Sequence, residues 1–146
     1  MAWTITVTHD ESVRMKHFLG GDRMEVVKFA CTSDATGGTI TLKHRDADPA
    51  NDYVHIMDVI RGSWLYLFKY VPAAGGSAPA GTADIDVEDK NNDHILDTDA
   101  NANDATTFVV GSDTLGVYPP IMNEITVVFA TLGDTKKADL YLYFLK

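Results

Sequence analysis

The stretch that decides the fold is WLYLFKYV, residues 64–71, where side chains alternate with a period of two. Trp64, Tyr66, Phe68 and Tyr70 fall on one face of an extended chain, because successive side chains of a strand point to opposite sides of the sheet. The other face is also largely apolar, which predicts a central strand. Core packing between two sheets is the favoured explanation of the aromatic row; a subunit interface and a carbohydrate-stacking surface are the alternatives.

Similar short segments, separated by turn signals, extend this β pattern along the chain. No segment keeps a 3.6-residue period over the ten or more residues that a helix would need. We therefore expect about eight to ten strands in an all-β fold, an antiparallel β-sandwich of the jelly-roll type, forming a single domain over residues 1–146. The expected strands are 3–8, 24–32, 39–43, 53–60, 64–71, 83–88, 94–96, 106–110, 124–131 and 138–145. Residues 13–19 form either a further strand, which we favour, or a short helical turn.

The connections between these segments carry their own signals. The polar loop 33–38, which ends in two glycines, predicts a hairpin between strands 24–32 and 39–43. Residues 9–12 are expected to end the first strand. Residues 72–81 (PAAGGSAPAG) are expected to form a flexible loop. Residues 89–93 predict a turn between two acidic strands.

Charge and cysteine content argue against several classes of partner and location. The chain has 21 acidic and 12 basic residues, a formal net charge of −9, and no cluster of Lys and Arg. This composition disfavours binding to nucleic acid or to an anionic membrane surface. The single cysteine, Cys31, is expected to be a small buried residue. The N-terminus shows no signal peptide, so we expect synthesis in the cytoplasm.

The densest acidic cluster lies between Asp84 and Asp99 and raises the question of a bound Ca²⁺ ion. Residues 89–93 place oxygen ligands as the start of a calcium loop does. The sixth position, however, is His94 instead of Gly, and the twelfth is Ala100 instead of Glu. A hairpin turn flanked by solvated acids is therefore favoured over a structural Ca²⁺ site, and no cofactor is expected.

No catalytic motif stands out in the sequence. The five histidines lack the spacing of a helical zinc site, and there is no CxxC, P-loop, G-x-S-x-G or G-x-G-x-x-G. We expect a protein that is not an enzyme.

Three segments resemble the small virion structural proteins of tailed bacteriophages, the head-decoration or cement proteins. They are MEVVKFACTSDATGGTITLK (24–43), GSWLYLFKYVPAAGGSAPAGTADIDVEDKNNDHILD (62–97) and NEITVVFATLGDTKKADLYLYFLK (123–146). The shared elements are a Pro-containing loop, a strand that alternates Asp with apolar residues, an acidic turn and a closing LYLYF strand. Where such proteins usually have Asp-Gly at the acidic turn, this chain has residues 91–93 (NND), so the turn type is expected to differ.

The resemblance implies a structural function at the capsid surface. Its implied partners are the major capsid protein and further copies of this chain, as a dimer or trimer, and its implied location is the virion. Many weak contacts on a lattice would add up to firm attachment. Two alternatives stay open: another virion part, such as a tail-tube, neck or fibre-base protein, and a β-sandwich module that binds carbohydrate or another ligand.

The first strand is the candidate contact site. Trp3, Ile5 and Val7 share one face of it, and an N-terminal strand can pair with a neighbouring chain by β-augmentation. We therefore expect these three side chains to contact another subunit or the capsid and not to belong to the core.

Overall fold

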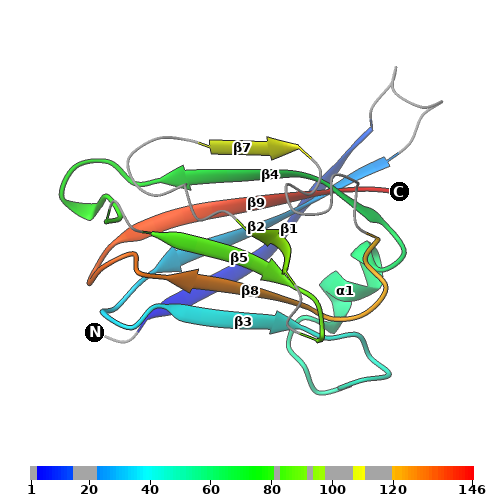
Figure 1. Ribbon diagram of the computed structural model, residues 1–146. Helices are drawn as coiled ribbons and strands as arrows, with labels where there is room; N and C mark the ends of the chain where they lie inside the picture. Colours follow the sequence, from blue (N-terminus) through cyan, green and yellow to red (C-terminus); the bar gives the residue numbers. More distant parts are fainter. Residues whose placement is uncertain (1–2, 15–22, 81–82, 92–93, 98–106, 111–119) are drawn as a thin grey trace.

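The computed structural model describes residues 3–14, 23–80, 83–91, 94–97, 107–110 and 120–146. These residues form nine strands, one short α-helix and one 3-10 turn (Figure 1). The elements are β1 (Thr4–Arg14), β2 (Arg23–Thr32), β3 (Gly38–Leu42), α1 (Val54–Ile60), β4 (Trp64–Pro72), η1 (Gly75–Ser77), β5 (Asp84–Glu88), β6 (His94–Asp97), β7 (Thr107–Val110), β8 (Ile125–Ala130) and β9 (Lys137–Leu145).

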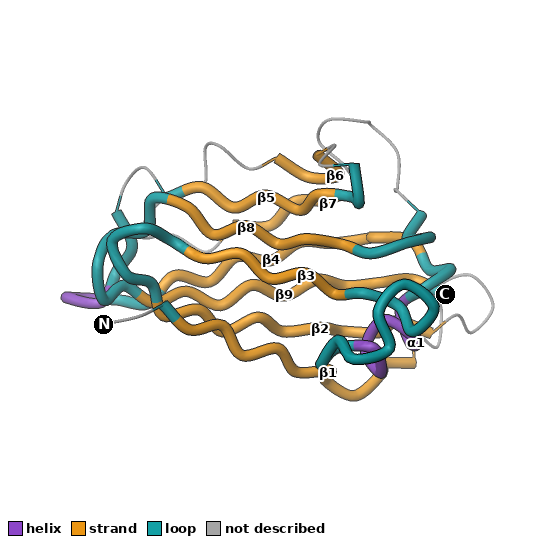
Figure 2. Tube along the Cα trace, turned by 90° about the horizontal axis from the view of Figure 1, so that it is seen from below, coloured by secondary structure: helices purple, strands orange, loops and turns teal. Residues whose placement is uncertain are grey.

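The strands form two antiparallel sheets that pack face to face. One sheet has the order β1-β2-β9-β4-β7 and the other the order β3-β8-β5-β6. Figure 2 shows them from a second direction, with α1 at the end of the sandwich near the C-terminus. This confirms the predicted all-β sandwich.

The strand order is that of a jelly roll, with β1 added at one edge. Strands β2 and β9, β3 and β8, β4 and β7, and β5 and β6 pair with each other. The eight strands from β2 to β9 are thus one long hairpin, with its tip between β5 and β6, that is rolled into two sheets. The pairs β4–β9 and β5–β8 join neighbouring parts of the roll.

The core lies between the inner faces of the two sheets. Phe29, Leu140 and Tyr70 stand directly opposite one another on β2, β9 and β4, and each is completely buried. Ile85 and Val87 of β5 and Val127 and Phe129 of β8 form the facing layer. In these strands, the apolar residues that alternate in the sequence are therefore the ones that are buried.

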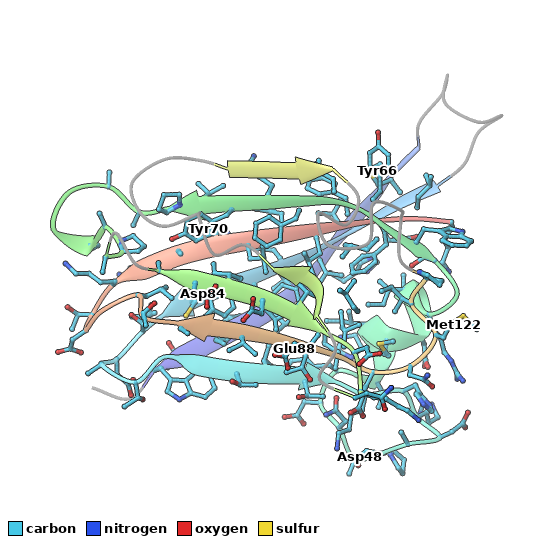
Figure 3. The ribbon with its side chains drawn as sticks, in the orientation of Figure 1. Asp48, Tyr66, Tyr70, Asp84, Glu88 and Met122 are labelled. Carbon is cyan, nitrogen blue, oxygen red and sulfur yellow. The ribbon has the colours of Figure 1, made fainter. Side chains whose placement is uncertain are left out.

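The aromatic row of residues 64–70 does not share one face as predicted. The β4–β9 register shifts between Leu65 and Leu67, so a bulge at Tyr66 breaks the period of two. Leu65, Phe68 and Tyr70 consequently point into the core, whereas the exposed fraction of Trp64 is 49%. In Figure 3 the hydroxyl of Tyr66 points away from the body of the molecule.

The strand predicted at residues 53–60 is wrong, because Val54–Ile60 forms α1. Its buried residues Ile56, Met57 and Ile60 follow helical spacing and close one end of the sandwich. A helix of this length makes barely two turns, which is too short for a sustained helical period to appear in the sequence.

The hairpin predicted between β2 and β3 is also wrong, since the two strands lie in different sheets. The backbone N–H of Ser33 donates to the carbonyl of Lys136 (2.8 Å), and the Ser33 hydroxyl donates to the carbonyl of Gly133. These bonds hold the 33–38 loop, which connects β2 to β3, against the loop that connects β8 to β9. Both loops therefore pass from one sheet to the other at the same end of the sandwich.

The first strand is longer than predicted. Instead of stopping at residues 9–12, β1 continues to Arg14 and absorbs a register shift between Asp10 and Val13. The remainder of the strand predicted at 13–19 lies outside the described residues.

Candidate binding surfaces

The outer face of the five-stranded sheet carries a row of two lysines and a tyrosine. Lys28, Tyr141 and Lys69 stand directly opposite one another on β2, β9 and β4. The two Nζ atoms lie 5.4 and 5.3 Å from the centroid of the Tyr141 ring, within the range of a cation–π contact. Two positive charges thus flank one aromatic ring in a chain whose net charge is −9.

Asp139 fixes one end of this row. Its Oδ2 lies 3.0 Å from Nζ of Lys28. The hydrogen bond to Asp139 raises the pKa of Lys28, so the ammonium group stays charged throughout the neutral range.

Apolar and aromatic side chains extend the row into a larger surface on the same face, which we call the platform. On the same face, Tyr143 pairs with Leu67, and Asp139 pairs with both Ala30 and Val71. All platform residues are half-buried: Lys28, Ala30, Leu67, Lys69, Val71, Asp139, Tyr141 and Tyr143. A surface with a tyrosine at its centre suits contact with another protein surface or stacking against a ring.

The predicted contact residues lie at the edge of the same sheet and face inward. Ile5 and Val7 stand opposite Cys31 and Phe29 of β2, are half-buried, and pack against the core. Their expected exclusion from the core therefore does not hold for this chain by itself. Their contact with another subunit or the capsid stays a prediction. Because both side chains are only half-buried, part of their apolar surface is still accessible to a partner.

Trp3 links the two sheets at this edge. A Cβ atom placed on Gly38 of β3 would lie 2.4 Å from the Trp3 ring, so the indole rests directly on the glycine. The backbone N–H of Trp3 donates to Oδ2 of Asp34 (3.3 Å). Hydrogen bonds from the hydroxyl and N–H of Thr36 lower the pKa of Asp34, which keeps this acceptor ionised.

Sequence reasoning missed a buried carboxylate next to β1. Glu25 is only 2% exposed, and its Oε2 lies 2.7 Å from Nε2 of His9. The signal was present, because Glu25 has the inward parity of Val27 and Phe29 in an alternating strand. The contact ties the middle of β1 to the interior.

Only part of the acidic region lies within the described residues. Asp84, Asp86 and Glu88 are half-buried on the outer face of β5 (Figure 3), and the β5–β6 hairpin predicted there is confirmed. Among the described residues no group of three His, Cys, Asp or Glu side chains is placed to hold a metal ion. Several ligands of the considered Ca²⁺ site, residues 92–93 and 98–99, lie outside that part of the chain.

A small pocket opens at the α1 end of the sandwich. It encloses about 220 Å³ and is lined by apolar residues including Ile95, Ile121 and Met122, with Asp89 and Glu124 at its polar side. Nε of Arg61 donates to the carbonyl of Met122 (3.1 Å), and the Met122 side chain is 59% exposed (Figure 3). The charged residues in its lining are Asp89, Lys90 and Glu124.

Cys31 is buried as expected, and burial raises the pKa of its thiol to about 11. Such a thiol is protonated at neutral pH and is a poor nucleophile. Within the described residues, no helix is long and apolar enough to cross a membrane.

Comparison with known proteins identifies no family. No family model and no curated protein matches the chain. Among solved structures, it is similar to the xylan-binding CBM22-1 domain of Paenibacillus barcinonensis Xyn10C, with a TM-score of 0.35, 16% identity and coverage of 99% of this chain and 85% of that one. It is also similar to the enzymatically active domain of bacteriophage CBA120 tailspike protein 4, with a TM-score of 0.28, 12% identity and coverage of 99% and 19%. Both scores are low, so the fold assignment rests on the strand order.

Proposed function

We propose that this chain is a non-enzymatic virion structural protein that decorates the outer surface of a phage capsid and stabilises its lattice. The platform carries the proposal. It offers a half-buried patch with Tyr141 at its centre and Tyr143 beside it on β9, and aromatic residues are enriched where proteins bind one another. The jelly-roll order adds support, because viral capsid domains are among the proteins that use this fold, although a fold alone does not define a function.

The charges of the platform suggest how it would recognise the capsid. Lys28 and Lys69 are the positively charged residues of the platform, and Asp139 is its negatively charged residue. An acidic patch on the major capsid protein would complement them, and Tyr141 would fill the centre of the contact. The rest of the chain is strongly acidic, and this net negative charge would keep the free protein in solution before it meets the capsid.

Binding to capsids that lack the protein tests the proposal. Purified wild-type chain is expected to bind such shells in a saturable manner. Tyr141→Ser should weaken binding about tenfold or more, because a central tyrosine is a typical hot-spot residue. Val128→Ser is the matched control, since Val128 is half-buried on the outer face of the other sheet. Equal binding by both variants would remove the platform from the contact, and no binding by wild type would overturn the proposal.

A second function is favoured by the same row of residues. A sugar ring that carries a carboxylate could stack on Tyr141 and pair its charge with Lys28 or Lys69. The chain would then be a module that binds acidic carbohydrate. Titration with uronic-acid oligosaccharides distinguishes the two functions: saturable binding that Tyr141→Ser abolishes supports the module, and absence of binding removes it.

A further inference from the structure

We infer that the open edge of β1 pairs with the same edge of a second copy of this chain and joins two five-stranded sheets into one. The inference does not rest on capsid binding, because the pairing would form in the free protein. It begins with the sheet edges. The described edge strands are β1 and β7 in one sheet and β3 and β6 in the other. Of these, β1 has 11 residues, and the other three have five or four.

The two halves of β1 differ in how well they are protected against pairing. Natural edge strands avoid unwanted partners through charged residues, prolines and bulges. The second half carries His9, Asp10, Glu11 and the register shift that follows Asp10. The first half, residues 4–8, has no charge, no proline and no bulge among its described pairs.

The sequence of this first half is complementary to itself. When two copies pair antiparallel about Thr6, Thr4 stands opposite the partner's Thr8, and Ile5 stands opposite the partner's Val7. Cross-strand Thr–Thr pairs and pairs of β-branched residues both stabilise a sheet. A shift by one residue would place threonines opposite apolar residues, so the pattern disfavours every register displaced by an odd number of residues.

The burial of these residues agrees with such a partner. Thr4, Thr6 and Thr8 are exposed on the outer face, while Ile5 and Val7 are half-buried at the open side of the sandwich. A second copy would cover the remaining apolar surface of Ile5 and Val7. It would also give hydrogen-bond partners to the backbone groups of β1 that face away from β2 and pair with no described strand.

The symmetry of this pairing has a consequence for the platform. Residues directly opposite each other in a sheet share a face, so the twofold axis stands perpendicular to the sheet. The platforms of both copies then face the same direction. Any surface that binds one platform would meet two, which increases avidity.

A charge placed at Thr6 tests the inference on the free protein. Wild type should have twice the 16.0 kDa chain mass by light scattering at micromolar concentration. Thr6→Lys should be monomeric, because it sets like charges directly opposite each other. Thr39→Lys is the matched control, since Thr39 is an exposed outer-face residue of edge strand β3, and it should stay dimeric. An equal mixture of Thr6→Lys and Thr6→Glu should recover the dimer.

Cross-linking keeps the inference testable if Thr6→Lys does not fold. In a Cys31→Ala background, Thr6→Cys should form a disulfide-linked dimer on mild oxidation, because opposite Cα atoms of an antiparallel pair lie about 4.5–5.5 Å apart. Thr39→Cys should not. A monomeric wild type, a Thr6→Lys variant that stays as dimeric as the control, or absence of the Thr6→Cys cross-link would each overturn the inference.

Discussion

Tyr70 places a hydroxyl in the centre of the core. The residue is completely buried, and its hydroxyl oxygen has no hydrogen-bond partner among the described residues. A buried polar atom without a partner costs about 1–3 kcal/mol of stability. Tyr70→Phe should therefore leave the free energy of unfolding unchanged or raise it by up to about 2 kcal/mol. Urea denaturation measures this, and a loss above about 1 kcal/mol would show that the hydroxyl is satisfied.

The same part of the core predicts sensitivity to alkaline pH. Burial raises the pKa of the Cys31 thiol from 9.0 to about 11 and that of Tyr70 from 10.0 to about 12. Between the ordinary and the raised values, the folded state holds more protons than the unfolded state. The contribution of these two groups to the free energy of unfolding should thus be constant below about pH 9, and the free energy of unfolding should fall as the pH rises from 9 towards 12.

Cys31→Ala isolates the contribution of the thiol. The variant should lose stability less steeply than wild type between pH 9 and 11, the window set by the raised pKa of Cys31. Urea denaturation at several pH values compares the two slopes. Parallel curves would mean that the thiol does not titrate differently in the folded and unfolded states.

At the scale of the elements, the contact between β1 and β3 depends on the absence of a side chain at Gly38. Its Cβ would lie 2.4 Å from the Trp3 ring, so Gly38→Ala must displace the indole. We expect a loss of about 1–3 kcal/mol, as for other overpacking substitutions. Gly76→Ala is the control, because its Cβ would meet nothing within 4 Å. Thermal unfolding that shows equal effects of both substitutions would contradict the packing of Trp3 on β3.

The elements also show which parts of the fold could be read from the sequence. Strands 24–32, 64–71 and 83–88 were predicted because alternation and β-branched or aromatic content are local signals. The helix Val54–Ile60 was missed because two turns give too few residues for a period. The bulge at Tyr66 was missed because it depends on the register with β9, which no local pattern specifies.

The candidate site was less predictable for a related reason. Lys28, Lys69 and Tyr141 lie on strands that are far apart in the sequence, and only their shared register on β9 brings them into one row. Trp3, Ile5 and Val7 could be grouped on one face of a strand because they alternate with threonines in the sequence. Their inward orientation could not be predicted, since it depends on which side of the sheet the second sheet covers.

At the scale of the whole molecule, the chain is a rolled hairpin for which we propose two means of association. The platform lies on the outer face of the five-stranded sheet, and the open β1 edge lies at its side. Together they would let paired copies bridge neighbouring positions of a lattice. The strand order within each sheet is set by pairing between residues far apart in the sequence. Alternation alone does not show whether a connection, such as the one at Ser33, stays within one sheet or passes to the other.

The copy number of this chain in purified phage particles tests the central claim most directly. Quantitative mass spectrometry would compare it with the copy number of the major capsid protein. We expect a ratio of this chain to the major capsid protein near one, or a fixed simple fraction such as one half, because a protein that covers the lattice occupies every equivalent position. A few copies per particle would assign the chain to the tail, neck or fibre base, and its absence from particles would contradict the proposed function.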